Sequence, residues 1–126
     1  LLAHPSAVDS AGALHLFADV AEGETLFQMS GSIEGLVSRA GRVASLAKEA
    51  GPLRGADIAG ALMVYCGGCM FAVRDHIGAV CDGVAETLPD TPFAGYFSFG
   101  EQGPVLGGAN RHGNLMISCI VFGRPG

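Results

Sequence analysis

The spacing of hydrophobic and polar residues predicts two helices around a central strand. Apolar residues recur at helical intervals from Ile33 to Ala47, with Ser32 in position to cap the helix. A continuous apolar run from Ile58 to Tyr65 lacks the charges of an exposed helix and predicts a buried strand. A second helical stripe extends from about Met70 to Leu88, and Pro89 ends it.

The two ends of the chain predict further strands. Residues 13–20 and 25–29 are apolar enough for two short strands, and the turn signal between them predicts a hairpin. Phe93–Phe99 and Leu115–Phe122 predict two more strands. Residues 1–12 contain Pro, Ser, Asp and Gly, and we expect a linker or an incomplete first element there.

The predicted order of elements is ββαβαββ. Because hairpins stand at the ends and helices between them, this order favours an α+β fold, with a mostly antiparallel sheet and two helices packed on one face. We expect residues 1–126 to form a single domain. Because the first residue is Leu1 and not Met, we also expect the chain to be a fragment of a longer protein.

Composition and charge argue against several classes of protein. The net charge is -5, with 7 basic and 12 acidic residues, which argues against nucleic-acid binding because that requires a basic patch. No apolar run approaches the roughly 20 residues of a transmembrane helix. The four cysteines are unevenly spaced, unlike those of a disulfide scaffold. We therefore expect a cytoplasmic domain.

The segment between the last two predicted strands is a glycine-rich loop with many functional groups. Its candidate ligand-binding side chains are Glu101, Gln102, Asn110, Arg111, His112 and Asn114. A carboxylate that holds an amine and a guanidinium that holds a carboxylate would suit a zwitterion such as an amino acid. The alternative is a surface loop whose polar groups are only solvated, with Asn114 bonded to backbone.

Cys66-Gly67-Gly68-Cys69 lies where the central strand meets the second helix. A thiol at a helix N-terminus can have a lowered pKa, as in dithiol oxidoreductases. The pair could also supply half of a zinc site, but no second Cys-x-x-Cys or His-x-x-His motif is present to complete one. The alternative is a glycine turn between small apolar residues, in which Cys66 could still line a pocket.

Signatures of the common enzyme classes are absent from the sequence. It has no Walker loop, no Gly-x-Ser-x-Gly, no His-Glu-x-x-His and no dinucleotide-binding fingerprint. Asp75 and His76 are adjacent, so on a helix their side chains point about 100° apart and form no dyad. We therefore expect a domain without catalytic activity of its own, although its parent chain could carry an enzyme.

Three segments of the chain resemble a known family. They are ALMVYC at residues 61–66, GYFSFGEQGP at residues 95–104, and RHGNL at residues 111–115 before an apolar strand. Together they resemble the C-terminal half of the FIST domain (FIST_C), and the resemblance extends more weakly to about Leu16. FIST domains are sensory input domains of bacterial-type signal-transduction proteins.

The resemblance implies a domain that binds small ligands such as amino acids. Glu101 and Asn114 match motif positions of the family, and a cysteine is also found at the position of Cys66. The family often has an arginine at the position of Cys69. This chain has a cysteine there instead, which puts in doubt an anion contact shared with the rest of the family at that position. The implied partners are a FIST N-terminal half and an output module, such as a histidine kinase or a cyclic-dinucleotide enzyme.

Other roles stay open beside this one. Some FIST proteins have been assigned as haem-based nitric oxide sensors, and His112 or His76 would be the candidate axial ligand here. No other cofactor is expected. FIST domains also occur beside F-box segments, which implies a protein-interaction module. A dithiol redox protein that uses Cys66 and Cys69 is the last alternative.

Overall fold

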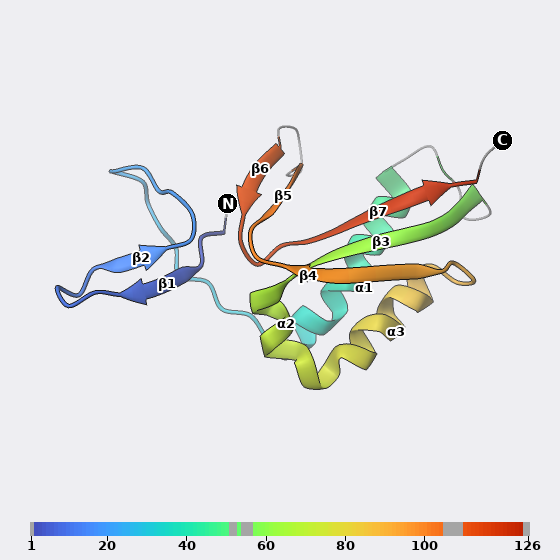
Figure 1. Cartoon of the computed structure of the whole chain (residues 1–126), viewed down its shortest axis with the longest axis horizontal. Coiled ribbons are helices and arrows are strands. Elements are labelled where there is room, and N and C mark those ends of the chain that lie inside the picture. Colours follow the sequence, from blue (N-terminus) through green and yellow to red (C-terminus); the bar gives the residue numbers. More distant parts are fainter. Residues whose placement is uncertain (1, 51–52, 54–56, 105–109, 125–126) are drawn as a thin grey trace.

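A three-stranded sheet with helices on one face forms the centre of the protein. The computed structural model describes residues 2–50, 53, 57–104 and 110–124. The sheet has the order β4-β3-β7 and consists of β3 (Ile58–Cys66), β4 (Phe93–Ser98) and β7 (Ile117–Gly123). The helices α1 (Ile33–Ala50) and α3 (Ile77–Thr87) lie side by side beneath it (Figure 1). This arrangement confirms the α+β fold with helices packed on one face.

The sequence predicts α1 and β3 closely. Ser32 caps α1, because its Oγ accepts a hydrogen bond from the Gly35 N–H at 3.0 Å. The predicted apolar stripe of α1 is buried at Ala40 and Ala44. β3 is the middle strand, with β4 on one side and β7 on the other. Its face toward the helices is buried at Ala61, Met63 and Tyr65, whereas Leu62 and Val64 on the other face are half-buried.

The second predicted helix begins earlier than expected and is divided. α2 (Gly67–Val73) starts directly after β3, η2 (Arg74–His76) is a single 3-10 turn, and α3 follows. Val73 before the tighter turn and Val80 after it are both buried, so the spacing of the apolar residues does not reveal the division, although Cys81 of the same predicted stripe is exposed. These segments form a crossover that returns the chain to the sheet in the same direction. β3 and β4 are therefore parallel, whereas β3 and β7 are antiparallel.

The N-terminal hairpin forms from different residues than the sequence pattern predicts. Its strands are β1 (Pro5–Val8) and β2 (Leu14–Leu16), whereas residues 25–29 form no strand. Asp9 fixes the turn, because its Oδ1 accepts hydrogen bonds from backbone N–H groups two and four residues later, both at 2.9 Å. The predicted turn at residues 21–24 does form, but the segments that flank it do not pair. The prediction of a hairpin from residues 13–20 and 25–29 was wrong because residues 1–12, which include the turn residue Asp9, were expected to be a linker or an incomplete first element.

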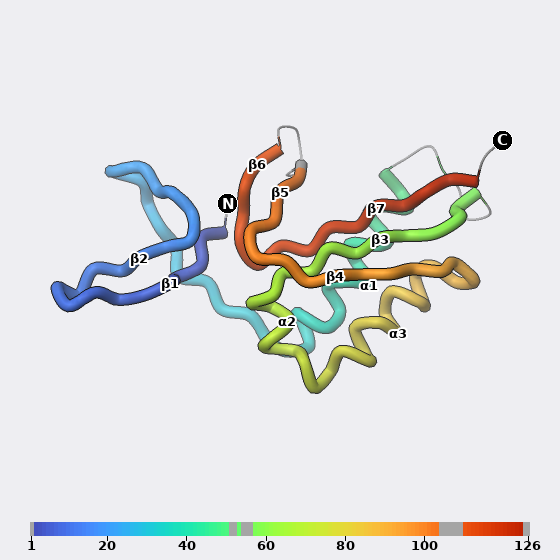
Figure 2. The backbone as a smooth tube through the Cα atoms, in the orientation of Figure 1, coloured from blue at the N-terminus to red at the C-terminus, as the bar shows by residue number. Residues whose placement is uncertain are grey.

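The loop predicted between the last two strands of the sheet is largely a hairpin. β5 (Glu101–Pro104) and β6 (Asn110–Gly113) pair in antiparallel register. They rise from the end of the sheet where β4 finishes and β7 begins (Figure 2). The sequence pattern did not predict these two strands. They consist mainly of glycine and polar residues, and neither has the alternation of apolar residues typical of a half-buried strand.

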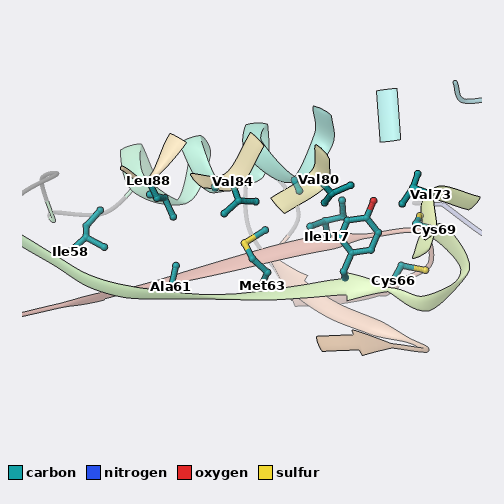
Figure 3. Packing of buried hydrophobic residues seen from close by; sticks show 13 residues of the cluster. Ile58, Ala61, Met63, Cys66, Cys69, Val73, Val80, Val84, Leu88 and Ile117 are labelled. Atoms are coloured by element: carbon teal, nitrogen blue, oxygen red, sulfur yellow. The ribbon is translucent and has the colours of Figure 1, made fainter. Parts of the chain in front are cut away.

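The buried core lies between the sheet and the helices. Met63 of β3 points toward Val84 of α3, with Ile117 of β7 and Val80 of α3 beside them (Figure 3). Full burial of such a side chain stabilises the fold by about 1.5–3 kcal/mol relative to leaving it exposed. The core therefore fixes the helices to one face of the sheet.

The opposite face of the sheet is apolar and largely uncovered. Of the described elements, no helix lies on this face (Figure 1). Strand pairing places Tyr96, Ile120 and Phe122 there, on the side opposite the helices. Their exposed fractions are 52%, 49% and 51%. Half-exposed aromatic and aliphatic side chains on one sheet face are typical of a contact surface.

The two long helices touch at a pair of glycines. A Cβ added at Gly41 of α1 would lie 2.7 Å from the carbonyl oxygen of Gly83 in α3. The Thr87 hydroxyl lies at the same point and donates to the Gly83 carbonyl at 2.9 Å. The backbone of α1 can approach α3 this closely because position 41 carries no side chain.

We expect Gly41→Ala to lower the free energy of unfolding by about 1–3 kcal/mol, the usual cost of overpacking. A matched control is Gly83→Ala, because a Cβ at Gly83 would meet nothing within 4 Å. Alanine is the better helix former, so this control should keep or raise the stability by up to about 1 kcal/mol. Urea unfolding followed by circular dichroism measures both. Equal destabilisation by the two variants would contradict the contact.

Candidate functional site

The candidate site lies where the parallel strands β3 and β4 end. β3 ends at Cys66, and α2 begins at the next residue. β4 ends at Ser98 and leads into Glu101. The ring of Phe99 covers the start of α2, since a Cβ added at Gly67 would lie 2.8 Å from it. Parallel strands often present binding residues at their carboxyl ends.

Glu101 is the buried polar centre of this region. Only 2% of the residue is exposed. Its Oε1 accepts a hydrogen bond from the Ser98 Oγ at 3.0 Å, whereas its Oε2 has no hydrogen-bond partner among the described residues. An unpaired buried acceptor costs about 1–3 kcal/mol, and more if it is charged. A bound hydrogen-bond donor would remove this cost.

The pairing of β5 with β6 separates the remaining loop residues onto two faces. Arg111 lies on the same face of the hairpin as Glu101. Gln102, Asn110 and His112 lie on the opposite face, and all three are exposed, as is Arg111. Of these four residues, the structure therefore brings only Arg111 to the face that carries Glu101.

Asn114 follows the hairpin and holds the N-terminal segment. Its Oδ1 accepts a hydrogen bond from the His4 N–H at 3.0 Å, and its own N–H donates to the Leu2 carbonyl at 3.2 Å. Its Nδ2 donates to the Gly113 carbonyl at 3.2 Å. The side chain is thus bonded to backbone, which was the alternative role for this residue. Asn114 links the candidate site to the N-terminal arm, by which we mean residues 2–17.

Cys66 and Cys69 lie near Glu101 and are both buried, with exposed fractions of 6% and 2%. Both thiols are free. Burial, followed by the neighbouring Cys66 thiol, raises the pKa of Cys69 to about 12, and the Glu101 carboxylate adds to this effect. A dithiol oxidoreductase needs an accessible thiol of lowered pKa. This geometry therefore argues against the redox alternative.

Arg39 and Ser98 belong to the same region, although the sequence did not single them out. The Nη1 of Arg39 donates to the Leu115 carbonyl at 2.8 Å, across 76 residues of sequence. Ser98 donates the hydrogen bond to Glu101. A lone polar residue between Phe97 and Phe99 was the available signal for Ser98. No local pattern could have indicated the partner of Arg39, because that partner is a distant backbone carbonyl.

Two cavities in the described part of the structure lie away from Glu101. One, of about 260 Å³, is lined by Lys48 and Asp90 among others. The other, of about 130 Å³, lies between α3 and β4. The candidate haem ligands His76 and His112 are both exposed and line neither cavity, whereas a haem needs an apolar slot. Within the described ranges, no group of three or more His, Cys, Asp or Glu residues could hold a metal ion.

Comparison with protein families decides what kind of domain this is. The family model described as FIST C domain matches residues 1–104. The chain belongs to the FIST C domain family. FIST C domains are sensory domains of signal-transduction proteins. The match includes Cys66, Glu101 and Gln102, and it ends before Asn114. Searches of curated proteins and of solved structures found no match.

None of the helices in the described ranges is long and apolar enough to span a membrane.

We expect Asn114→Ala to loosen the N-terminal arm of the FIST C domain without unfolding the sheet. The variant removes the acceptor of the His4 N–H. Loss of about 1 kcal/mol, typical of one hydrogen bond, should speed exchange of the His4 amide about fivefold. Hydrogen exchange measured by NMR reports this directly. Asn110→Ala, on an exposed strand position, is the control, and equal exchange in both variants would refute the link.

The raised pKa of Cys69 predicts a loss of stability at high pH. The ordinary value is 9.0, and the folded protein raises it to about 12. The unfolded chain therefore loses this proton first, so stability that is present below pH 9 is lost as the pH rises toward 12. Urea unfolding from pH 7 upward measures the decline, and Cys69→Ala should make it shallower. Part of the decline remains, because burial also raises the pKa values of Tyr65 and Cys119. A decline of the same slope in Cys69→Ala would exclude this thiol as its cause.

Proposed function

We propose that this FIST C domain is the sensory input of a signalling protein and binds a small polar ligand at Glu101. The observation that supports this most is the Oε2 atom of Glu101, which is buried without a hydrogen-bond partner among the described residues. Folded proteins pair nearly all such atoms. A ligand that donates a hydrogen bond would satisfy this one.

The surroundings of Glu101 favour an amino acid as the ligand. An ammonium group would satisfy the free oxygen and compensate the buried charge. Arg111 lies on the same face of the hairpin and is free to hold a carboxylate of the same ligand, since no described residue forms an ion pair with it. Cys66 and the exposed ring of Phe99 would then contact the side chain of the ligand.

The same contacts suggest how occupancy reaches the rest of the parent protein. Gly113 pairs with Glu101 across the hairpin and directly precedes Asn114, which holds His4. A ligand that binds one arrangement of β5 and β6 more tightly would shift the population toward it. The N-terminal arm would move with the hairpin, and the output module would respond to that movement.

The remaining partners in this proposal belong to the parent chain. A FIST N-terminal half would pack on the uncovered sheet face at Tyr96, Ile120 and Phe122. This contact would bury half-exposed apolar side chains, which is favourable. The free cysteines suit the cytoplasm, where thiols stay reduced.

Glu101→Gln tests the ligand site. Without ligand, the variant should be as stable as the wild type or more stable, because it buries an amide in place of a carboxylate. A ligand at about 100 times its Kd stabilises the wild type by roughly 2.7 kcal/mol. For a chain of this length, that is a melting shift on the order of ten degrees. In a thermal melt against L-amino acids, the variant should show no shift.

Glu86→Gln is the matched control, because it makes the same charge change on the exposed surface of α3. It should respond to amino acids as the wild type does. The panel also contains amines without a carboxylate and carboxylates without an amine, which separate the role of Glu101 from that of Arg111. An unchanged shift in Glu101→Gln would place the site elsewhere. A large loss of stability without ligand would make Glu101 a structural residue.

A further inference from the structure

β4 forms one edge of the central sheet, and its backbone is free along the outer side (Figure 1). In the described part of the chain, β4 pairs only with β3. The Pro92 carbonyl accepts a hydrogen bond from the Ala61 N–H at 3.0 Å, so the even-numbered residues of β4 face β3. Phe93, Gly95 and Phe97 therefore direct their N–H and C=O groups away from the sheet, where another strand can pair with them.

β4 lacks the features that usually protect an edge strand. Its six residues include no charge and no proline, and its register with β3 is continuous. Folded proteins block exposed edges with charges, prolines or bulges, or cover them with a helix. At the opposite edge of the sheet, α1 packs against β7. β4 is more open, because an apolar cavity of about 130 Å³ lies between this strand and α3.

The side chains along this edge suit a second copy of the same strand. Antiparallel pairing of β4 with itself, centred on Gly95, would place Phe97 next to the partner's Phe93 on the side of the helices. On the other face, Tyr96 would lie next to the partner's Ala94. Phe97 and Tyr96 are 48% and 52% exposed in the single chain, so this pairing would bury apolar surface on both faces of the sheet.

The charges near this edge are complementary under the same two-fold axis. Of the described residues, none that carries a charge lines the cavity beside β4, and Asp82 and Glu86 lie on the far side of α3. Arg74 precedes Cys81 by two turns and lies nearer the groove, and its ion pair with the exposed Asp75, at 3.7 Å, is weak. Because the axis makes the two α3 helices antiparallel, Arg74 would lie level with the C-terminal end of the partner's α3, where the helix dipole is negative.

We propose that β4 pairs with the β4 of a second copy, so that the three strands of each chain join into one continuous sheet. The dimer is symmetric, with Gly95 at the axis. Its core is a strand of six residues from each copy, which is less than the roughly 20–30 residues a side of a standard interface. The dimer is therefore weak, with a Kd of about 10–100 µM, and it does not depend on a ligand at Glu101.

Sedimentation velocity tests this dimer. The full chain should pass from monomer to dimer between about 1 µM and 1 mM. Phe97→Lys places a charge on the edge and should weaken the dimer by at least about tenfold. Phe122→Lys is the matched control, because this ring is exposed to the same degree, at 51%, but lies on β7. The control should leave the dimer Kd unchanged.

A crosslink and a charge reversal locate the contact. The axis places the exposed Cys81 of one copy across from the partner's Cys81, so a bis-maleimide with a flexible spacer should join them, as located by mass spectrometry. Cys81→Ser should lose the crosslink and keep the dimer. Arg74→Glu should weaken the dimer by at least about fivefold, because the axis repeats the contact. Arg42→Glu, on the exposed surface of α1, should leave the dimer Kd unchanged.

Three outcomes would overturn the proposal. The first is a chain that stays monomeric at about 1 mM. The second is a dimer that Phe122→Lys dissociates and Phe97→Lys does not, because two copies would then meet through the uncovered sheet face. The third is a dimer in which Cys81 forms no crosslink to its copy. If Phe97→Lys does not fold, Arg74→Glu and the crosslink decide.

Discussion

The parallel pairing of β3 with β4 is the constraint on which the rest of the structure depends. It requires a crossover, and the crossover starts at Gly67 without an intervening loop. The same pairing sets Cys66 beside Ser98, whose hydroxyl donates to the Oε1 of Glu101 three residues later. A shift of one residue would turn Ser98 to the other face of the sheet. This register therefore decides that the end of β3 and the Ser98–Glu101 pair meet at one place.

The sequence predicted the elements whose stability depends on local pattern. The cap at Ser32, the stripe of α1 and the apolar run of β3 are all signals within a few residues of each other. The pattern did not predict which strands pair, because pairing depends on distant contacts. The N-terminal hairpin shows this, since residues 25–29 have strand-like composition but no partner strand in the described structure.

The sequence predicted which kinds of residues the candidate site contains better than it predicted how those residues are arranged. Glu101 was singled out as a carboxylate that could hold an amine and as a match to a motif position of the family, and the structure does bury it. The sequence could not separate Arg111 from His112, because that separation follows from the register of β5 with β6. Asn114 was expected to contact ligand, but its hydrogen bonds to residues 2–4 are contacts across the whole chain. A buried acceptor without a partner is costly, and such exceptions to local rules concentrate at functional sites.

The contact between Phe99 and Gly67 gives the start of α2 a cover that can open. Phe99 is 80% exposed, and its ring fills the space that a side chain at position 67 would need. The atoms that a side chain at position 67 would meet are the far end of this ring, and the ring has solvent on its other side. A small side chain at position 67 would therefore turn the ring outward and leave the backbone unchanged. The start of α2 is thus covered by a removable ring, so its exposure to solvent depends on the rotamer of a single side chain.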